Sequence, residues 1–359
     1  MKTFPLQIAL LAALLVNDAP TWSQSKTYFP RPDAKWETVK AKKAGLNPEG
    51  IQDALDLSFR NQSTSVVILY RGRIVAERHL LNDDPKLKEI RLGRMRIGAN
   101  SAGYSIEDVA SVQKSVTSLL VGLTVNKQLL QLDDPVSKYL GAGWSKATPS
   151  QEARILVRHL ITMSSGLNRK LEYVAKPGTR WAYNTSVYAL VMQVVEKAGG
   201  SDRNTLTKNW LLKPIHMADS KWINRPNAIR TTSGNTFGFA TTARDLAKLG
   251  WLILNDGKWD RETVYKHTDY FKQMTRSSQS MNPAYGYLWW LNGKEFSLRP
   301  AGIRSKGWLI PTAPADMFDA SGALGRKLYI VPSKQLVVVR LGAQPQLSYP
   351  RQFWKTLLK

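Results

Sequence analysis

Hydrophobic residues follow a strand-like pattern near both ends of the chain. The segment 65–78 holds two extended runs around an Arg-Gly pair, and the segment 327–342 holds two more around Ser-Lys-Gln. Two such runs joined by a short turn predict a β-hairpin. The aromatic stretch 285–292 indicates a further strand. We therefore expect strands near both termini.

The middle of the chain has a different period. From Ser111 to about Leu254 the apolar residues recur with mostly helical spacing, interrupted by polar loops. A shorter helix is expected at 48–59, where an Asn-Pro pair provides the N-cap and the first turn. The last residues, 351–359, predict a closing helix.

Strands at both ends with helices between them indicate an α+β protein. The terminal strands would form one antiparallel sheet flanked by helices, with an inserted helical region, whereas a doubly wound parallel sheet would need alternating strands and helices. The chain has 359 residues, 43% of them hydrophobic, which is enough for a large core. We expect an N-terminal extension at 24–47 and one domain at 48–359, with a helical subdomain at about 125–250.

The first residues, MKTFPLQIALLAALLVND, combine a lysine with a short apolar run. The run is too short for a usual membrane span, and its pattern is typical of a secretory signal peptide, expected at 1–23. An uncleaved membrane anchor is the alternative, because ALLVNDAPTWSQ offers a poor cleavage site. The chain contains no cysteine, so disulfides and thiolate catalysis are excluded. We expect a periplasmic or secreted bacterial protein with no stable membrane span after cleavage.

The net charge of +24 at pH 7 favours anionic partners through long-range attraction. No zinc finger, RNP motif or basic heptad helix is present, so nucleic acid is not an expected partner. We interpret the charge as a basic surface that lies close to an anionic cell-envelope polymer.

The stretch ASVQKSVTSLLVGL places Ser111 and Lys114 at the head of an apolar run. Residues three apart share one face of a helix. A serine hydroxyl is a weak nucleophile until a neighbour accepts its proton, and a lysine can accept it when desolvation keeps the amine partly neutral. The backbone N–H of Ser111 can also stabilise a developing oxyanion. The spacing alone favours an ordinary start of a core helix, and the same Ser-x-x-Lys spacing also occurs at Ser23 and Lys26, where no site is expected.

Further segments occur in a characteristic order: LVRHLITMSSGL at 156–167, WAYNTSVYALV at 181–191, GFATTARDLAKLG at 238–250, and YGYLWW with KLYIVP nearer the C-terminus. Together with the Ser111 stretch they resemble the serine β-lactamase and penicillin-binding protein superfamily. The likeness runs from about residue 65 to 342. It is greatest to the class C-like hydrolases, the branch of esterases and 6-aminohexanoate-oligomer hydrolases. The resemblance implies a β-lactamase/transpeptidase-like fold.

The resemblance also implies catalytic roles. Ser111 would be acylated, Lys114 would be the base, and Tyr183 would relay the proton to the leaving group, its phenolate favoured by Lys114. The family's second motif is usually Tyr-x-Asn, and here Thr185 takes the place of the asparagine. Threonine can still donate one hydrogen bond to a substrate carbonyl.

The family's third motif, usually Lys-Thr-Gly or His-x-Gly, has two possible registers here. The preferred register is Ala323-Leu324-Gly325, which makes the backbone N–H of Arg326 the second oxyanion donor beside that of Ser111. The other register is Ala320-Ser321-Gly322, with the N–H of Ala323 as the donor. In both registers an alanine replaces the residue that helps to bind a substrate carboxylate in the family. This replacement argues against true β-lactamase or carboxypeptidase activity.

We therefore expect an exported serine hydrolase that forms an acyl-enzyme on Ser111 and hydrolyses a small-molecule or peptide-like ester or amide. No cofactor is expected, and the four histidines lack metal-ligand spacing. Two alternatives stay open. One is a β-lactamase or D,D-peptidase that acts on β-lactams or peptidoglycan peptides, and the other is a catalytically silent envelope-binding protein on the same scaffold.

Overall fold

The computed structural model describes residues 27–225, 235–266 and 269–359. The predicted signal peptide lies outside these ranges. Within them, no helix combines the length and the apolar character needed to cross a membrane.

A six-stranded sheet forms the centre of the molecule, with the order β2-β1-β14-β13-β12-β9 and antiparallel pairing throughout. The strand nearest the N-terminus pairs with the last strand of the chain, so that Val67 lies opposite Val339. This confirms the predicted antiparallel sheet built from both chain ends. The strands are β1 (Ser63–Tyr70), β2 (Arg73–His79), β9 (Trp290–Leu291), β12 (Phe318–Ser321), β13 (Lys327–Val331) and β14 (Leu336–Gly342).

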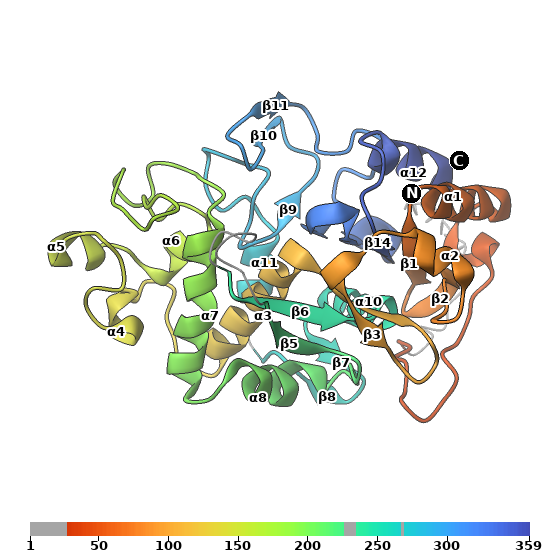
Figure 1. Ribbon diagram of the computed structural model, residues 1–359, viewed down its shortest axis with the longest axis horizontal. Coiled ribbons are helices and arrows are strands. Elements are labelled where there is room, and N and C mark those ends of the chain that lie inside the picture. The colour runs from red at the N-terminus through yellow and green to blue at the C-terminus, as the bar shows by residue number, and fades with distance from the viewer. Residues whose placement is uncertain (1–26, 226–234, 267–268) are drawn as a thin grey trace, which may run out of the picture.

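Helices cover both faces of this sheet (Figure 1). Helices α1 (Pro48–Arg60) and α12 (Tyr349–Leu357) pack on one face, while α10 (Ala243–Leu254) and α3 (Gln113–Asn126) lie on the other. Side chains alternate between the faces along β1, with Val66 and Ile68 in the first core and Val67 and Leu69 in the second. A strand buried on both sides needs a continuous apolar run, which explains the sequence of β1.

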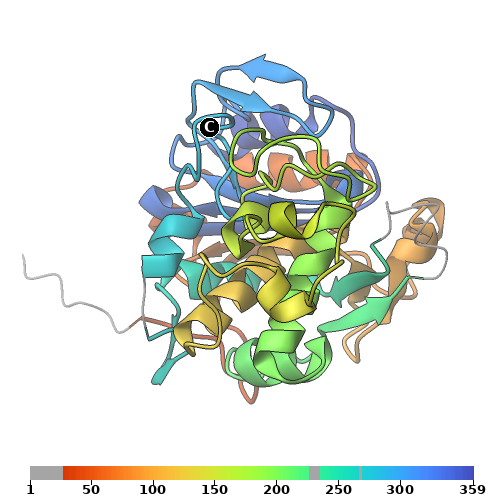
Figure 2. The ribbon, with the colours of Figure 1, turned by 90° about the vertical axis from the view of Figure 1, so that its left-hand side faces the viewer.

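The inserted region stands beside the sheet and carries most of the helices (Figure 2). Its helices are α3, α4 (Ser137–Leu140), α5 (Pro149–Glu152), α6 (Val157–Ile161), α7 (Thr185–Gly199), α8 (Arg203–Thr207) and a π-helical turn at Lys208–Leu212. A second antiparallel sheet has the order β3-β4-β6-β5, with β3 (Arg96–Ala99), β4 (Ser105–Asp108), β5 (Lys221–Asn224) and β6 (Phe237–Thr241). Two of these strands therefore lie within the mostly helical section.

The strand predicted at 285–292 is reduced to the two residues of β9. Leu288 has a φ of +62°, and Tyr285 bridges Trp290, so the stretch folds back on itself as a tight turn. An L-residue with positive φ cannot continue an extended run, and the prediction of a full strand is wrong for that reason.

The remaining elements are short. They are the helices α2 (Pro85–Glu89) and α11 (Asp269–Met274), the strands β7 (Lys258–Trp259), β8 (Glu262–Thr263), β10 (Phe296–Leu298) and β11 (Arg304–Lys306), and the 3-10 turns η1 (Ala41–Ala44), η2 (Gly93–Met95), η3 (Ala110–Val112), η5 (Ala323–Gly325) and η6 (Pro332–Lys334). Before α1, the indole N–H of Trp36 donates to the carbonyl of Gly72 at 2.7 Å. This contact attaches the N-terminal segment to the edge of the central sheet.

Candidate active site

Ser111 lies where the second sheet joins the long buried helix α3. The chain leaves β4, makes the turn η3 and enters α3, whose residues from Gln113 to Thr124 are all buried. Ala110, directly before the serine, has a φ of +52°. The carboxylate of Asp108 accepts a hydrogen bond from the N–H of Ala110 at 3.0 Å. The turn is thus held by β4 on one side and by the buried helix α3 on the other.

Lys114 lies one turn further along, and its Nζ is 3.0 Å from the Oγ of Ser111. The side chain is 2% exposed, and its Nζ lies 5.0 Å from the ring centre of Tyr183 and 4.5 Å from that of Tyr188. Burial, with a smaller contribution from the charge of Arg225, lowers the pKa of Lys114 to about 7. A large fraction of this amine is therefore neutral at neutral pH and can accept the proton of the serine.

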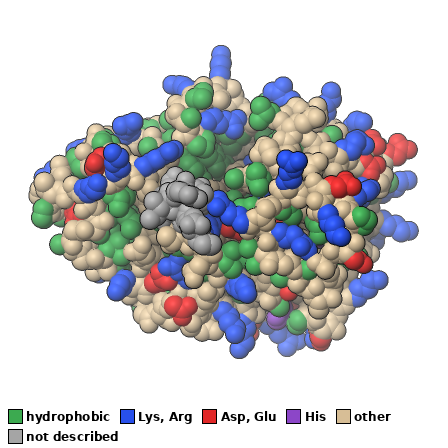
Figure 3. Space-filling view, in the orientation of Figure 1, with side chains coloured by type: hydrophobic (Ala, Val, Ile, Leu, Met, Phe, Trp, Pro, Cys, Tyr) green, Lys and Arg blue, Asp and Glu red, His purple; other side chains and the backbone are tan. Residues whose placement is uncertain are grey.

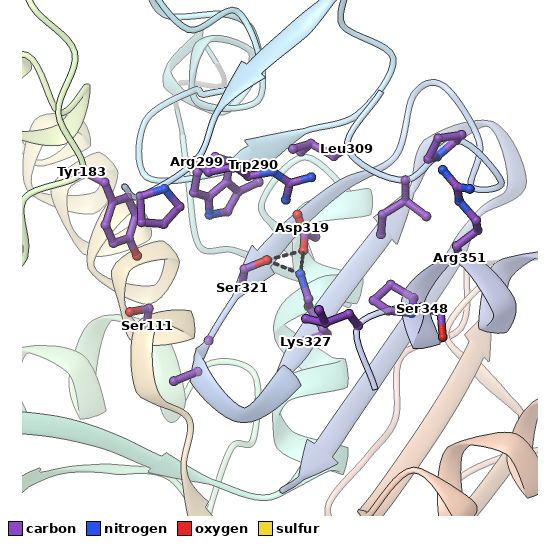
Figure 4. Close-up of a pocket in the computed structure, with 17 residues that line it drawn as sticks. Ser111, Tyr183, Trp290, Arg299, Leu309, Asp319, Ser321, Lys327, Ser348 and Arg351 are labelled. Carbon is purple, nitrogen blue, oxygen red and sulfur yellow. Dashed lines mark hydrogen bonds and ion pairs between the residues drawn. The ribbon is translucent and has the colours of Figure 1, made fainter. Parts of the chain in front are cut away.

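Tyr183 approaches Ser111 from the loop before α7 (Figure 4). Its ring stacks on Trp290 with centroids 5.9 Å apart. Burial raises the pKa of the Tyr183 hydroxyl to about 12, although its hydrogen bond with Ser111 opposes the shift. The expected phenolate is therefore not the resting form. A neutral hydroxyl between the serine and the cavity can still pass a proton in either direction.

Thr185 does not line the cavity beside Ser111. Asn184 caps α7, because its Oδ1 accepts hydrogen bonds from the N–H groups of Ser186 and Val187. Its Nδ2 donates to the carbonyl of Leu167. Since the cap falls on Asn184, Thr185 already belongs to the helix. The structure does not bring Thr185 into the cavity lining, and its substrate-binding role stays a prediction.

The strand β12 brings the other register of the third motif to the serine. An atom added as Cβ on Gly322 would lie 2.4 Å from the carbonyl oxygen of Val109, so this glycine packs directly against the turn that carries Ser111. Ser321, Gly322 and Ala323 all line the cavity.

The preferred register lies elsewhere. Gly325 packs against Pro345 and Arg340. Arg326 is fully buried, where its guanidinium donates to Glu107 at 2.9 Å and its carbonyl accepts from the N–H of Gly322. Neither Gly325 nor Arg326 lines the cavity, so the structure does not bring the preferred register to Ser111. The backbone N–H of Ala323 is left as the candidate partner of the Ser111 N–H.

A second polar cluster lines the same cavity and was missed from the sequence (Figure 4). The ammonium of Lys327 donates to Asp319 at 2.7 Å and also to the hydroxyl of Ser321, which in turn donates to Asp319 at 2.6 Å. Ser321 and Lys327 are directly paired across β12 and β13. A lysine on the neighbouring strand thus brings a positive charge close to the position where Ala320 replaces the family's lysine. Alternation along two paired strands is the signal that could have revealed it.

The cavity has a volume of about 750 Å³ and a mixed lining. Hydrophobic side chains form the floor of a hollow in the upper part of the face shown in Figure 3. The lining comprises Ser111, Tyr183, Trp290, Arg299, Pro300, Leu309, Ile310, Pro311, Asp319, Ser321, Gly322, Ala323, Lys327, Leu347, Ser348, Pro350 and Arg351. A smaller hollow of about 260 Å³ shares Tyr183 and Pro300 with it. Space is therefore available on two sides of Tyr183.

No cluster of metal-ligating side chains occurs within the described ranges.

Comparisons with known proteins identify the family and the fold. The model of the Beta-lactamase family matches residues 61–354. An uncharacterised protein of Alkalihalophilus pseudofirmus is 27% identical over 324 residues, which cover 82% of this chain and 87% of that protein.

Two solved structures share the fold. A Bacillus anthracis protein assigned as a 6-aminohexanoate-dimer hydrolase has a TM-score of 0.64 and 15% identity, covering 90% of this chain and 86% of that one. EstCE1, described as a hydrolase with promiscuous acyltransferase activity, has a TM-score of 0.61 and 14% identity, covering 89% of this chain and 98% of that one.

Proposed function

The chain belongs to the Beta-lactamase family, and on this premise we propose that it is a serine hydrolase that forms an acyl-enzyme on Ser111 and cleaves an ester or amide bond. The observation that carries the proposal is the 3.0 Å contact between Ser111 and Lys114, whose pKa is lowered to about 7. A serine paired with a partly neutral amine at the floor of a cavity has what nucleophilic catalysis requires.

The reaction would proceed in two halves. In the first, the neutral amine of Lys114 accepts the proton of Ser111 while Oγ bonds to the substrate carbonyl carbon. The resulting oxyanion is stabilised by the N–H groups of Ser111 and Ala323. The carbonyl re-forms as the bond to the leaving group breaks, and Tyr183 gives its proton to the leaving group and takes the proton held by Lys114. In the second half, water attacks the ester on Ser111, and the same groups move its proton back to Oγ.

The first candidate substrate class is an ester or amide with an apolar acyl part. Leu309, Ile310 and Pro311 line the cavity that the serine faces, and such side chains favour an apolar group over a highly solvated one. The names of the two structural neighbours, an amide hydrolase and a hydrolase with acyltransferase activity, agree with this class.

One observation favours β-lactams or peptidoglycan peptides as the second candidate. Lys327 brings an ammonium group into the cavity, where it can attract a substrate carboxylate. That ammonium is paired with Asp319 at 2.7 Å, however, so most of its charge is already compensated. We therefore rank esters and simple amides above β-lactams. A silent binding protein is ranked below both, because nothing else accounts for the buried Lys114 beside Ser111.

The cellular setting is a separate proposal that the sequence supports. The first residues have the pattern of a signal peptide, and the charge is +24. We propose that the protein acts in the periplasm or outside the cell, where its basic surface attracts an anionic envelope polymer.

The deciding experiment is intact-mass analysis after incubation with a fluorophosphonate. The probe phosphonylates an activated serine and releases fluoride, so one adduct on the wild type and none on Ser111→Ala supports the proposal. A folded wild type that forms no adduct would favour the binding protein instead. Turnover of a short nitrophenyl ester should then exceed turnover of a chromogenic cephalosporin. The opposite order would support the β-lactamase alternative.

A further inference from the structure

Asp108 is a buried carboxylate three residues before Ser111, and the proposed chemistry does not use it. It is 3% exposed and lies at the end of β4. Its Oδ1 accepts from the N–H of Ala110, the residue that adopts positive φ directly before the nucleophile. An ordinary buried acid is costly unless it is paired, so this one must have a partner.

That partner is Arg225, which comes directly after β5. Its Nε donates to Oδ2 of Asp108 and its Nη2 donates to Oδ1, both at 2.7 Å. The pair is bidentate, and the side chains are 11% and 4% exposed for Arg225 and Asp108 respectively. Gly238 on β6 leaves room for it, because a Cβ there would lie 2.4 Å from Oδ2 of Asp108. Three segments distant in sequence therefore meet around one carboxylate.

The same arginine also contacts the residue directly before Lys114. Nη2 of Arg225 donates to the side chain of Gln113 at 3.4 Å, and Gln113 directly precedes Lys114. The titratable groups around Lys114 are otherwise the phenols of Tyr183, Tyr188 and Tyr285, whose pKa values are all raised by burial. Since those phenols are neutral, Arg225 is the charged group that lowers the pKa of Lys114 among the described residues, and Asp108 is the counter-ion of that arginine.

We propose that Asp108 and Arg225 form a positioning pair, which holds the Ala110 turn in place and sets the electrostatic environment of Lys114. This proposal rests on the proposed function, because it assigns a role to the pair only if Lys114 is the base. The guanidinium disfavours a second positive charge on Lys114, and the carboxylate moderates that effect while it anchors the turn.

The test exploits the opposite signs of the two charges. Arg225→Gln removes the cation and leaves the carboxylate, so the acidic limb of the pH profile of kcat/KM for a nitrophenyl ester should move to higher pH by about 0.5 unit or more. Asp108→Asn keeps an oxygen that can accept from the N–H of Ala110 but leaves Arg225 without its counter-ion, so the limb should move to lower pH. Arg225→Lys retains the charge and should leave the limb closer to its wild-type position.

A matched control separates this effect from general destabilisation. Arg203 makes a similar bidentate pair with Glu196, at 2.8 and 2.9 Å, between α7 and α8. Arg203→Gln should leave the limb unchanged even if it lowers the thermal midpoint. The pairing proposal would be overturned if the acidic limb of the pH profile stayed fixed in Arg225→Gln and Asp108→Asn. It would also be overturned if the limb moved in the same direction in both variants.

The two proposals fail in different ways. If the wild type forms no fluorophosphonate adduct on Ser111, the proposed function itself is wrong. If the adduct forms and its rate has the wild-type pH dependence in both variants, only the role of the pair is wrong. The labelling rate against pH therefore serves as the second readout, and it requires no knowledge of the natural substrate.

Discussion

At the scale of single residues, the protonation of Lys114 decides what the site can do. The ordinary pKa of a lysine is 10.5, and burial lowers that of Lys114 to about 7. The neutral form is the base, so activity should rise with pH through a limb near pH 7 and then level off. The same burial lowers the stability of the fold, because Lys114 binds its proton less tightly in the folded chain than in the unfolded chain.

Lys114→Met should therefore abolish acylation and stabilise the fold. Between about pH 7 and 10.5 the unfolded lysine binds a proton that the folded lysine releases, so wild-type stability rises with pH across that window and its penalty is complete below it. The free energy of unfolding of the variant should exceed that of the wild type by about 4 kcal/mol at pH 7, with the difference shrinking towards pH 10. Urea unfolding at several pH values measures this. A difference that does not change with pH would contradict it.

Ala110 is a second residue whose conformation matters more than its chemistry. Its φ of +52° lies in the left-handed region, where an alanine is strained and a glycine is not. Ala110→Gly should raise the free energy of unfolding by about 1 kcal/mol. Ala102, an exposed alanine in the loop after β3, is a suitable control, because it is absent from the positive-φ residues and its replacement by glycine should not stabilise. Equal effects at the two positions would show that strain is not the cause.

At the scale of elements, β1, β13 and β14 were predictable because they are buried on both faces and need apolar runs. The edge strand β2 is half-exposed and of mixed sequence, and it was predictable from the Arg-Gly turn that joins it to β1. Helical spacing predicted that Ser111 and Lys114 share a face, but it was the ordered series of motifs along the chain that singled out this pair. The structure places Thr185 and Arg326 outside the cavity lining, because a sequence motif does not show where a helix cap or a tight turn begins. Asn184 takes the cap of α7, and the turn after Gly322 takes Arg326 out of the cavity.

The buried pair Glu107 and Arg326 links β4 to that turn. Both side chains are fully buried and 2.9 Å apart, and Thr64 also donates to the carboxylate. Arg326→Met leaves Glu107 buried without its counter-ion, so we expect a loss of about 3–5 kcal/mol. The double variant Glu107→Gln with Arg326→Met should recover a large part of it. Denaturant unfolding of the wild type, Arg326→Met, Glu107→Gln and the double variant gives the coupling energy between the two residues, and additive losses would argue against the pair.

At the scale of the whole molecule, the charge of +24 acts on every substrate that approaches. Basic side chains are spread over the face that contains the hollow (Figure 3). Arg299 and Arg351 line the cavity itself, on two sides of the Lys327 cluster (Figure 4). A positive field over a low-dielectric hollow concentrates anions there and raises their association rate. The charge is therefore expected to select among esters that the catalytic groups would treat alike.

An ester whose apolar acyl chain ends in a carboxylate should thus have a higher kcat/KM than the neutral ester of equal length. Leu309, Ile310 and Pro311 can accommodate the apolar chain, while the two arginines attract the terminal carboxylate. The ratio of the two kcat/KM values should fall several-fold between about 10 and about 500 mM salt, because the screening length shrinks from about 30 to about 4 Å.

Arg299→Gln with Arg351→Gln should lower this ratio at low salt, since these charges lie beside the bound substrate. Lys42→Gln with Lys43→Gln removes the same total charge from the exposed turn η1 and should change the ratio far less. If the two double variants behave alike, the field of the whole molecule decides the preference. If neither changes the ratio and salt has no effect on it, charge does not select the substrate.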